Sequence, residues 1–147
     1  MKKSILSLLL MLGMFVANAQ FRKIPAEVTD SFKARYENAS AVTWKDKMSY
    51  FQAEFKMGDK VMKANFSSKG EWLKTETKHQ YATLPADVQD GFKKSKYATM
   101  EVKDVLQVEE KAKDSQYKVV VKKNDYNKKT LVFASNGQLL SDDGGIL

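Results

Sequence analysis

Cysteine is absent from this 147-residue chain, and histidine and proline are scarce, with one and two residues respectively. Without cysteine the chain forms no disulfide and has no lipid-anchor cysteine, so its stability must come from buried apolar surface and backbone pairing. Zinc sites of the usual Cys/His type are excluded as well, because His79 is the only residue of either kind. His79 falls between the two halves described below, where we expect a solvated linker residue.

Motifs for catalysis and for cofactor binding are also missing. The chain contains no G-x-S-x-G, no phosphate-binding loop and no G-x-G-x-x-G. Glu109 and Glu110 are adjacent on an expected strand, so their carboxylates point to opposite faces and cannot share a proton. The sequence therefore predicts a protein that is not an enzyme and that holds no cofactor.

The first nineteen residues have the layout of a secretory signal peptide. Lys2 and Lys3 form a basic start, residues 5–16 are almost wholly apolar, and Ala17 and Ala19 are the small residues before the expected cleavage site. The apolar run is too short to span a bilayer, and no later run approaches the roughly 20 residues that a spanning helix needs. We therefore expect cleavage after Ala19 and a periplasmic or secreted protein that is not inserted in a membrane.

The chain has an excess of positive charge. Lysine and arginine outnumber aspartate and glutamate by 25 to 18, which gives a formal net charge of +7. After cleavage, residues 20–79 have 12 basic and 8 acidic side chains, and residues 80–147 have 11 and 10. Both signs are mixed along every segment, without the basic stripe that neutralises phosphates. A nucleic-acid partner is therefore not expected.

Two segments of the sequence occur twice, in the same order. Residues 24–33, IPAEVTDSFK, return as 84–93, LPADVQDGFK, and residues 66–70, FSSKG, return as 133–137, FASNG. Two ordered landmarks of this kind indicate an internal duplication. We expect one compact domain around one core, with a short polar C-terminal tail. Its expected parts are a signal peptide over 1–19, a first repeat over 20–79 and a second repeat over 80–147.

Each repeat opens with a helical pattern and continues with alternating ones. Val28 and Phe32, like Val88 and Phe92, stand four residues apart and mark the apolar stripe of a helix. Alternation with a period of two then predicts four strands in each repeat. These strands are expected around 41–47, 49–56, 62–66 and 71–77, and around 100–109, 116–122, 128–134 and 138–141. The predicted fold class is α+β, with two tandem helix-plus-four-stranded antiparallel meanders and the helices packed on one face of a shared sheet.

The two faces of the expected sheet differ in composition. The face under the helices takes Phe51, Phe55 and Phe66, and the other face stays open. Leu73 competes with Trp72 for the core, which places Trp72 outside. Aromatic side chains are enriched where protein interfaces concentrate their binding energy. The candidate protein-binding residues of the open face are Trp44, Tyr50, Gln52, Val61, Lys63, Trp72, Lys118, Val120 and Val132.

Taken in order, the landmark residues resemble a known family. They are Ile24, Pro25, Val28, Phe32, Trp44, Tyr50 or Phe51, Phe55, Phe66, Gly70, Trp72 and Leu73, with a restart at Leu84, Pro85, Val88 and Phe92. This series resembles the exported PepSY-like proteins of Bacteroidetes-type bacteria. The resemblance implies the fold of the β-lactamase inhibitor protein, in which two such repeats share a concave sheet, and by analogy a role as an inhibitor or periplasmic interaction module. The second repeat departs from the pattern, with Val108 in place of Trp44 and Leu139 in place of Trp72.

Two functional hypotheses are open at this point. The first is a non-enzymatic exported protein-binding module, an inhibitor or regulator of an envelope or extracellular protein, that binds through the open face of the sheet. The alternative is a periplasmic sensor or carrier of a small ligand or a cation such as calcium. This alternative would use acidic loops and the tail around Asp142, Asp143 and Gly144, because carboxylate oxygens are ligands that calcium prefers.

Overall fold

The computed structural model describes residues 22–124 and 127–142, so the expected signal peptide and Asp143 lie outside the described residues. All the helices and strands expected in the described part are present, which confirms the α+β class. In chain order they are α1 (Ala26–Arg35), β1 (Ser40–Asp46), β2 (Phe51–Met57), β3 (Lys60–Phe66), β4 (Trp72–His79), a short 3-10 helix η1 (Tyr81–Thr83), α2 (Ala86–Lys94), β5 (Glu101–Glu110), β6 (Gln116–Asn124), β7 (Asn127–Ala134) and β8 (Leu139–Ser141).

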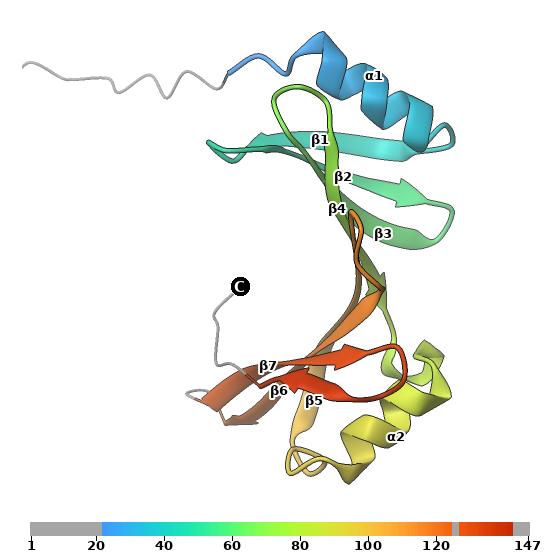
Figure 1. Cartoon of the computed structure of the whole chain (residues 1–147), viewed down its shortest axis with the longest axis vertical. Coiled ribbons are helices and arrows are strands. Elements are labelled where there is room, and N and C mark those ends of the chain that lie inside the picture. Colours follow the sequence, from blue (N-terminus) through green and yellow to red (C-terminus); the bar gives the residue numbers. More distant parts are fainter. Residues whose placement is uncertain (1–21, 125–126, 143–147) are drawn as a thin grey trace, which may run out of the picture.

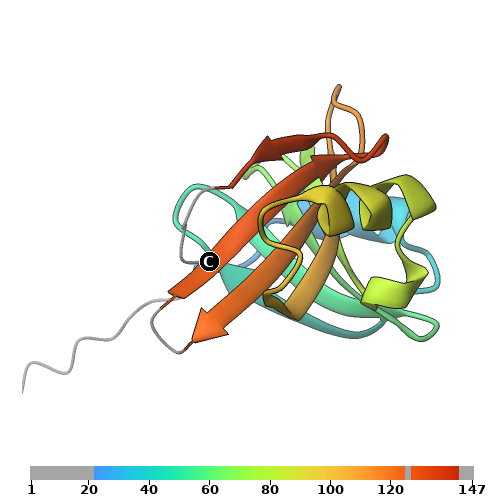
Figure 2. The same ribbon diagram turned by 90° about the horizontal axis from the view of Figure 1, so that it is seen from below.

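The eight strands form one antiparallel sheet in chain order, so each strand pairs only with its neighbours along the chain. Strands β4 and β5 are the neighbours joined through η1 and α2, and their pairing from Lys74 opposite Glu110 to His79 opposite Val105 makes the sheet continuous. Figure 1 shows α1 and α2 at opposite ends of the molecule with the sheet running between them. In the view from below, α2 lies across the strands of its own half (Figure 2).

Both helices begin directly after a proline and bury one apolar stripe. Pro25 and Pro85 are the N-cap residues, and neither helix has a side-chain cap. Val28 and Phe32 are buried in α1, and the matching positions are buried in α2. Each stripe is short because each helix makes fewer than three turns. No helix in the described part of the chain combines the length and hydrophobicity needed to cross a bilayer.

The buried apolar residues form two clusters, where the sequence suggests one core. One cluster lies under α1 and includes Phe55 and Phe66, and the other lies under α2 and includes Leu131 and Phe133. Between them, the helix side of β4 and β5 carries polar residues such as Thr77, which faces Gln107 across the strands. Because these side chains are polar, apolar packing is interrupted between the two clusters. The hydrogen-bonded backbone of the sheet connects them instead.

A β-bulge at Leu73 decides which side Trp72 takes. Asn65 pairs with Lys74 and Phe66 pairs with Trp72, so Leu73 is the extra residue between them. A bulge of this kind resets the alternation, and Trp72 therefore shares the helix side with Phe66. Leu73 is 38% exposed, whereas Trp72 packs against the α1 cluster. The expectation that Leu73 lies inside and Trp72 outside is wrong.

The second half holds its residue equivalent to Trp44 at Val105. Trp44 pairs with Ala53 in β2, and Val105 pairs with Val119 in β6. The next partners across the sheet are Ala64 and Leu131, which lie two residues before the repeated phenylalanines 66 and 133. The expectation that Val108 replaces Trp44 is therefore wrong. Val108 is buried on the opposite face, away from α2.

A bidentate ion pair ties the segment before α1 to the end of β1. Arg22 donates through Nε to Asp46 at 2.8 Å and through its terminal nitrogen to the second carboxylate oxygen. The same guanidinium lies 5.0 Å from the ring centroid of Phe51. The hydrogen bonds from Arg22 lower the pKa of Asp46 to about 2. The ion pair therefore fixes where the chain enters the first helix.

We expect Asp46 to titrate near pH 2 and to return toward the ordinary aspartate pKa of about 3.9 in an Arg22→Gln variant. Because the folded pKa lies below the unfolded one, this pair stabilises the fold above about pH 4 and loses its effect as the pH falls through about 2. Carboxyl-carbon NMR titration measures the shift. A Lys23→Gln variant is the matched control and leaves Asp46 unchanged. An Asp46 that titrates near 4 in the unmodified protein would contradict the prediction.

Candidate functional site

The open face of the sheet is the side opposite the one on which α1 and α2 pack. Its residues alternate along β1 to β8 with those that pack under α1 and α2. A residue and the residue paired with it on the neighbouring strand point to the same face of the sheet. The strand register therefore shows which face each side chain occupies. In Figure 1 the helices lie on the outer side of the curved sheet, and the open face is its inner side.

Six charged side chains of this face, which we call the charged row, cross the sheet from β1 to β6. They are Lys45, Glu54, Lys63, Lys74, Glu76 and Lys118. Within the row, Glu54 Oε1 accepts from Lys45 Nζ at 2.8 Å and lies 3.3 Å from Lys63 Nζ. The hydrogen bond from Lys45 is the main reason that the pKa of Glu54 is lowered.

Glu76 is the centre of the charged row. Its Oε1 accepts from Lys74 Nζ at 2.8 Å and lies 3.6 Å from Lys118 Nζ, while Lys63 stands directly across from it in β3. The Glu76 side chain is only 14% exposed. Burial raises its pKa, but the hydrogen bond from Lys74 and the charges of Lys74, Lys118 and Lys63 lower it more. The net direction is downward, so Glu76 stays ionised at neutral pH.

Two further residues are buried on the open face although no helix covers it. Asn65 accepts a hydrogen bond from Gln52 Nε2 at 3.0 Å and is 3% exposed. Val108 is 2% exposed, and half-buried Leu106, in the same strand, points to the same side. Part of the open face is therefore buried by neighbouring side chains of the same face.

The structure brings six of the nine candidate residues together on the open face. These are Gln52, Val61, Lys63, Lys118, Val120 and Val132. Tyr50 lies in the bend before β2 and is half-buried. The two remaining candidates, Trp44 and Trp72, do not belong to this face. Whether the six residues bind a partner stays a prediction.

Both tryptophans contact the α1 core. Trp44 meets Phe32 edge to face with ring centroids 5.3 Å apart. Trp72 donates its Nε1–H to Thr75 Oγ1 at 2.8 Å and is covered by the Arg35 guanidinium at 3.8 Å from the ring centroid. The indole rings thus have structural partners within the first half, and the expectation that they line the open face is corrected.

Sequence reasoning missed Lys45, Lys74 and Glu76, which complete the charged row. Lys74 and Glu76 were missed because Thr75 and Thr77 take the inward positions of β4, so this strand shows no alternation of apolar with polar residues. The usable signal is the alternation of charged residues with threonine over 74–78, KTETK. That pattern identifies the two sides of a strand even when both are polar.

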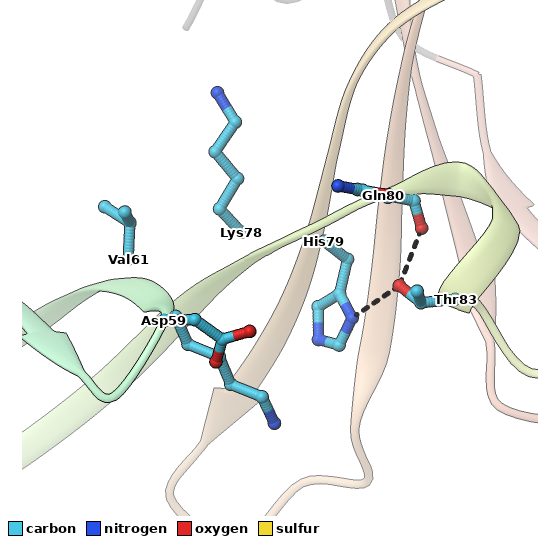
Figure 3. A pocket seen from close by; sticks show the side chains of 7 residues that line it. Asp59, Val61, Lys78, His79, Gln80 and Thr83 are labelled. Carbon is cyan, nitrogen blue, oxygen red and sulfur yellow. Dashed lines mark hydrogen bonds between the residues drawn. The ribbon is translucent and has the colours of Figure 1, made fainter.

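His79 belongs to β4 and is no linker residue. Its Nε2 lies 3.1 Å from Gln107 Oε1. Its Nδ1 lies 3.5 Å from the hydroxyl of Thr83, which donates to the Gln80 carbonyl oxygen (Figure 3). The side chain lines an open hollow of about 660 Å³ between the β2–β3 turn and η1. Only Gln80 separates the end of β4 from η1, so His79 lies close to the Thr83 hydroxyl.

Asp142, the tail carboxylate of the calcium hypothesis, already has partners in the protein. It accepts a hydrogen bond from the Tyr97 hydroxyl and lies 3.1 Å from Lys96 Nζ. The Tyr97 hydrogen bond and then Lys96 lower the pKa of Asp142. Within residues 22–124 and 127–142 no group of three or more histidine, aspartate or glutamate side chains is arranged to hold a metal ion.

Comparisons with known proteins give a family and a fold. A family model described as "Putative beta-lactamase-inhibitor-like, PepSY-like" matches residues 49–141. A BLIP-like protein from Bacteroides fragilis is 27% identical with a TM-score of 0.79, over 84% of this chain and 88% of that one. A DUF2874 family protein from Bacteroides ovatus is also 27% identical with a TM-score of 0.79, over 82% and 87%.

A third solved structure extends the likeness in fold. It comes from Bacteroides eggerthii, is described as "putative periplasmic proteins", and is 23% identical with a TM-score of 0.77 over 82% of this chain and 88% of that one. No curated protein matches this chain significantly.

Proposed function

Because the chain belongs to the PepSY-like, β-lactamase-inhibitor-like family, we propose that it is a non-enzymatic protein-binding module that uses the open face of its sheet. The target is an envelope or extracellular protein, which this module inhibits or regulates. The description of a similar structure as BLIP-like supports an inhibitor-type role. The fold does not identify the target, because proteins with related folds have different functions.

One observation carries the proposal, namely that no helix within residues 22–124 and 127–142 covers one broad face of the sheet. Both helices pack on the other side, and all eight strands belong to the one sheet. An antiparallel sheet with one free face is stable when that face is polar, and the charged row supplies the polarity. Half-buried Leu106, Val120 and Val132 lie on the same face and give it the mixed polar and apolar character of a protein interface.

We also propose that the protein works outside the cytoplasm, as a periplasmic or secreted protein. The support is the signal-peptide pattern of residues 1–19 and the description of the Bacteroides eggerthii structure. A chain without cysteine needs no oxidative folding after export.

We further infer that the chain arose by duplication of a helix-plus-four-strand unit. The bulge at Leu73 has a counterpart at Leu140, since Val132 pairs with Ser141 and Phe133 with Leu139. The helix-end tyrosines also match, because the Tyr36 hydroxyl bonds Thr75 in β4 and the Tyr97 hydroxyl bonds Asp142 directly after β8. These shared details support a common ancestor for the two halves, beyond the repeated sequence segments.

The binding proposal can be tested by site-directed photo-cross-linking, which a cysteine-free chain makes simple. A single cysteine is introduced as Val120→Cys on the open face and labelled with a benzophenone maleimide. On illumination with an envelope extract of the producing bacterium, we expect an adduct of defined mass. Excess unlabelled protein should suppress that adduct, because a specific site is saturable.

The matched control is Lys93→Cys, labelled in the same way on the exposed side of α2. It should give no adduct that unlabelled protein suppresses. Equal adducts from both positions, or a suppressible adduct from Lys93→Cys alone, would show that the open face is not the binding surface.

A further inference from the structure

We propose that the partner of the open face presents an acidic protein surface, and that the four lysines of the charged row are its main recognition elements. The inference rests on the proposed function and adds the chemistry of the partner. The charge that this face shows to a neighbouring molecule depends on which of its charged side chains are exposed as well as on their number.

Each lysine of the charged row is more exposed than the carboxylate with which it pairs. Lys45 and Lys63 are 49% and 48% exposed, whereas the Glu54 side chain that they share is 27% exposed. Lys74 and Lys118 are 31% and 21% exposed. The Glu76 side chain between them is 14% exposed. In each pair an approaching protein therefore meets a larger exposed fraction of the lysine than of the glutamate.

Four lysines against two glutamates leave the charged row with two uncompensated positive charges. Both glutamates have lowered pKa values, Glu54 chiefly through the hydrogen bond from Lys45 and Glu76 through Lys74 and the neighbouring lysines. Both therefore stay ionised near neutral pH. Beside the row, Lys78 pairs with Asp104 at 3.4 Å with the same order of exposure, 61% for the lysine and 35% for the aspartate. Glu110, which stands across from Lys74 in β5, pairs with Lys113 at 2.5 Å and so does not offset the charge of the row. The charged row and these two neighbouring pairs together carry a net positive charge.

The helices do not share this excess. Residues 26–35 of α1 contain two acidic and two basic side chains, and residues 86–94 of α2 contain two of each as well. The two helices are thus charge-balanced, while the charged row of the open face is not. An acidic partner would be steered to the open face and not to the helices.

The partner expected from this chemistry is a protein, because the face is not uniformly basic. Leu106, Val120 and Val132 are half-buried there, and they can be covered by apolar side chains of a protein surface. A carboxylate-rich patch with apolar residues at its centre would complement both parts of the face. The lysines would then select and orient the partner, and the apolar contacts would hold it.

The experiment uses poly-L-glutamate of about twenty residues as the probe, measured by calorimetry at about 0.01 M and about 0.15 M ionic strength, where the screening lengths are about 30 and 8 Å. The test variant is Lys63→Gln/Lys118→Gln. The control variant is Lys33→Gln/Lys93→Gln, which removes the same charge from the two helices. At the lower ionic strength we expect saturable binding that the test variant weakens roughly fivefold or more and the control less than twofold.

A second pair, Lys45→Gln/Lys63→Gln, guards against misfolding of the first, because both side chains are about half exposed. Thermal unfolding of all variants confirms that they fold. Equal weakening by the test and control variants, or no saturable binding by the unmodified protein, would overturn the inference. A suppressible Val120→Cys adduct together with either of those results would leave the open face as the binding surface and remove only its acidic partner.

Discussion

Replacing Gly137 by alanine is expected to lower the free energy of unfolding by about 3 kcal/mol. Gly137 has φ +83°, a left-handed conformation that costs an L-residue roughly 1–2 kcal/mol. A Cβ at this position would also overlap the carbonyl oxygen of Asp87 in the first turn of α2, and overpacking of this kind costs about 1–3 kcal/mol. Urea denaturation measures the loss directly.

Gly58 provides the matched control for this prediction. It has φ +61°, but a Cβ there would meet no atom within 4 Å. Gly58→Ala should therefore cost only the conformational part, about 1 kcal/mol. Similar losses for the two variants would show that contact between α2 and the β7–β8 turn is not what requires glycine at position 137.

The second large effect is expected from Thr75→Val, at about 3 kcal/mol of lost stability. Thr75 is 1% exposed, and its hydroxyl oxygen accepts from Trp72 Nε1 at 2.8 Å and shares a hydrogen bond with the Tyr36 hydroxyl. Valine keeps the shape but removes the oxygen. The indole N–H, which can only donate, and the Tyr36 hydroxyl are then left without their partner, at about 1–3 kcal/mol each.

Thr77→Val makes the same change two residues farther along the same side of β4. The Thr77 hydroxyl forms no hydrogen bond with the residues that the structure describes, so this variant should stay within about 0.5 kcal/mol of the unmodified protein. Chemical denaturation compares the two. A Thr75→Val protein as stable as Thr77→Val would mean that the buried hydrogen bonds contribute nothing to stability.

Simple alternation was sufficient to place most strands and faces, because the apolar residues there are large and regularly spaced. Phe51 and Phe55 lie under α1 as expected, and the helix stripe of Val28 and Phe32 is buried against them. Alternation predicts the wrong face at Leu73, because a bulge adds one residue there and no residue type in the sequence indicates the bulge. The face of Trp72 could therefore not be derived from its neighbours in sequence.

The candidate site was predicted in part for a related reason. Gln52 and Lys63 follow from the alternation of β2 and β3, whose inward residues are apolar. Glu76 does not, because the inward residues of β4 are threonines and hydrophobicity alone cannot tell the two sides apart. The central position of Glu76 depends on the pairing of β4 with β5, two strands separated by a whole helix in the chain.

The strand order also bears on how the chain folds. Every strand pairs with its neighbour along the chain, and α1 packs on strands that follow it within the first half. Strands β1 to β4 can therefore pair with one another as soon as the chain has been synthesised up to His79. Only the edge of β4 that pairs with β5 needs later residues. Short-range pairing of this kind lowers the contact order and favours fast folding. Such a sheet can grow strand by strand from its N-terminal end as the chain emerges from the ribosome or a translocation channel.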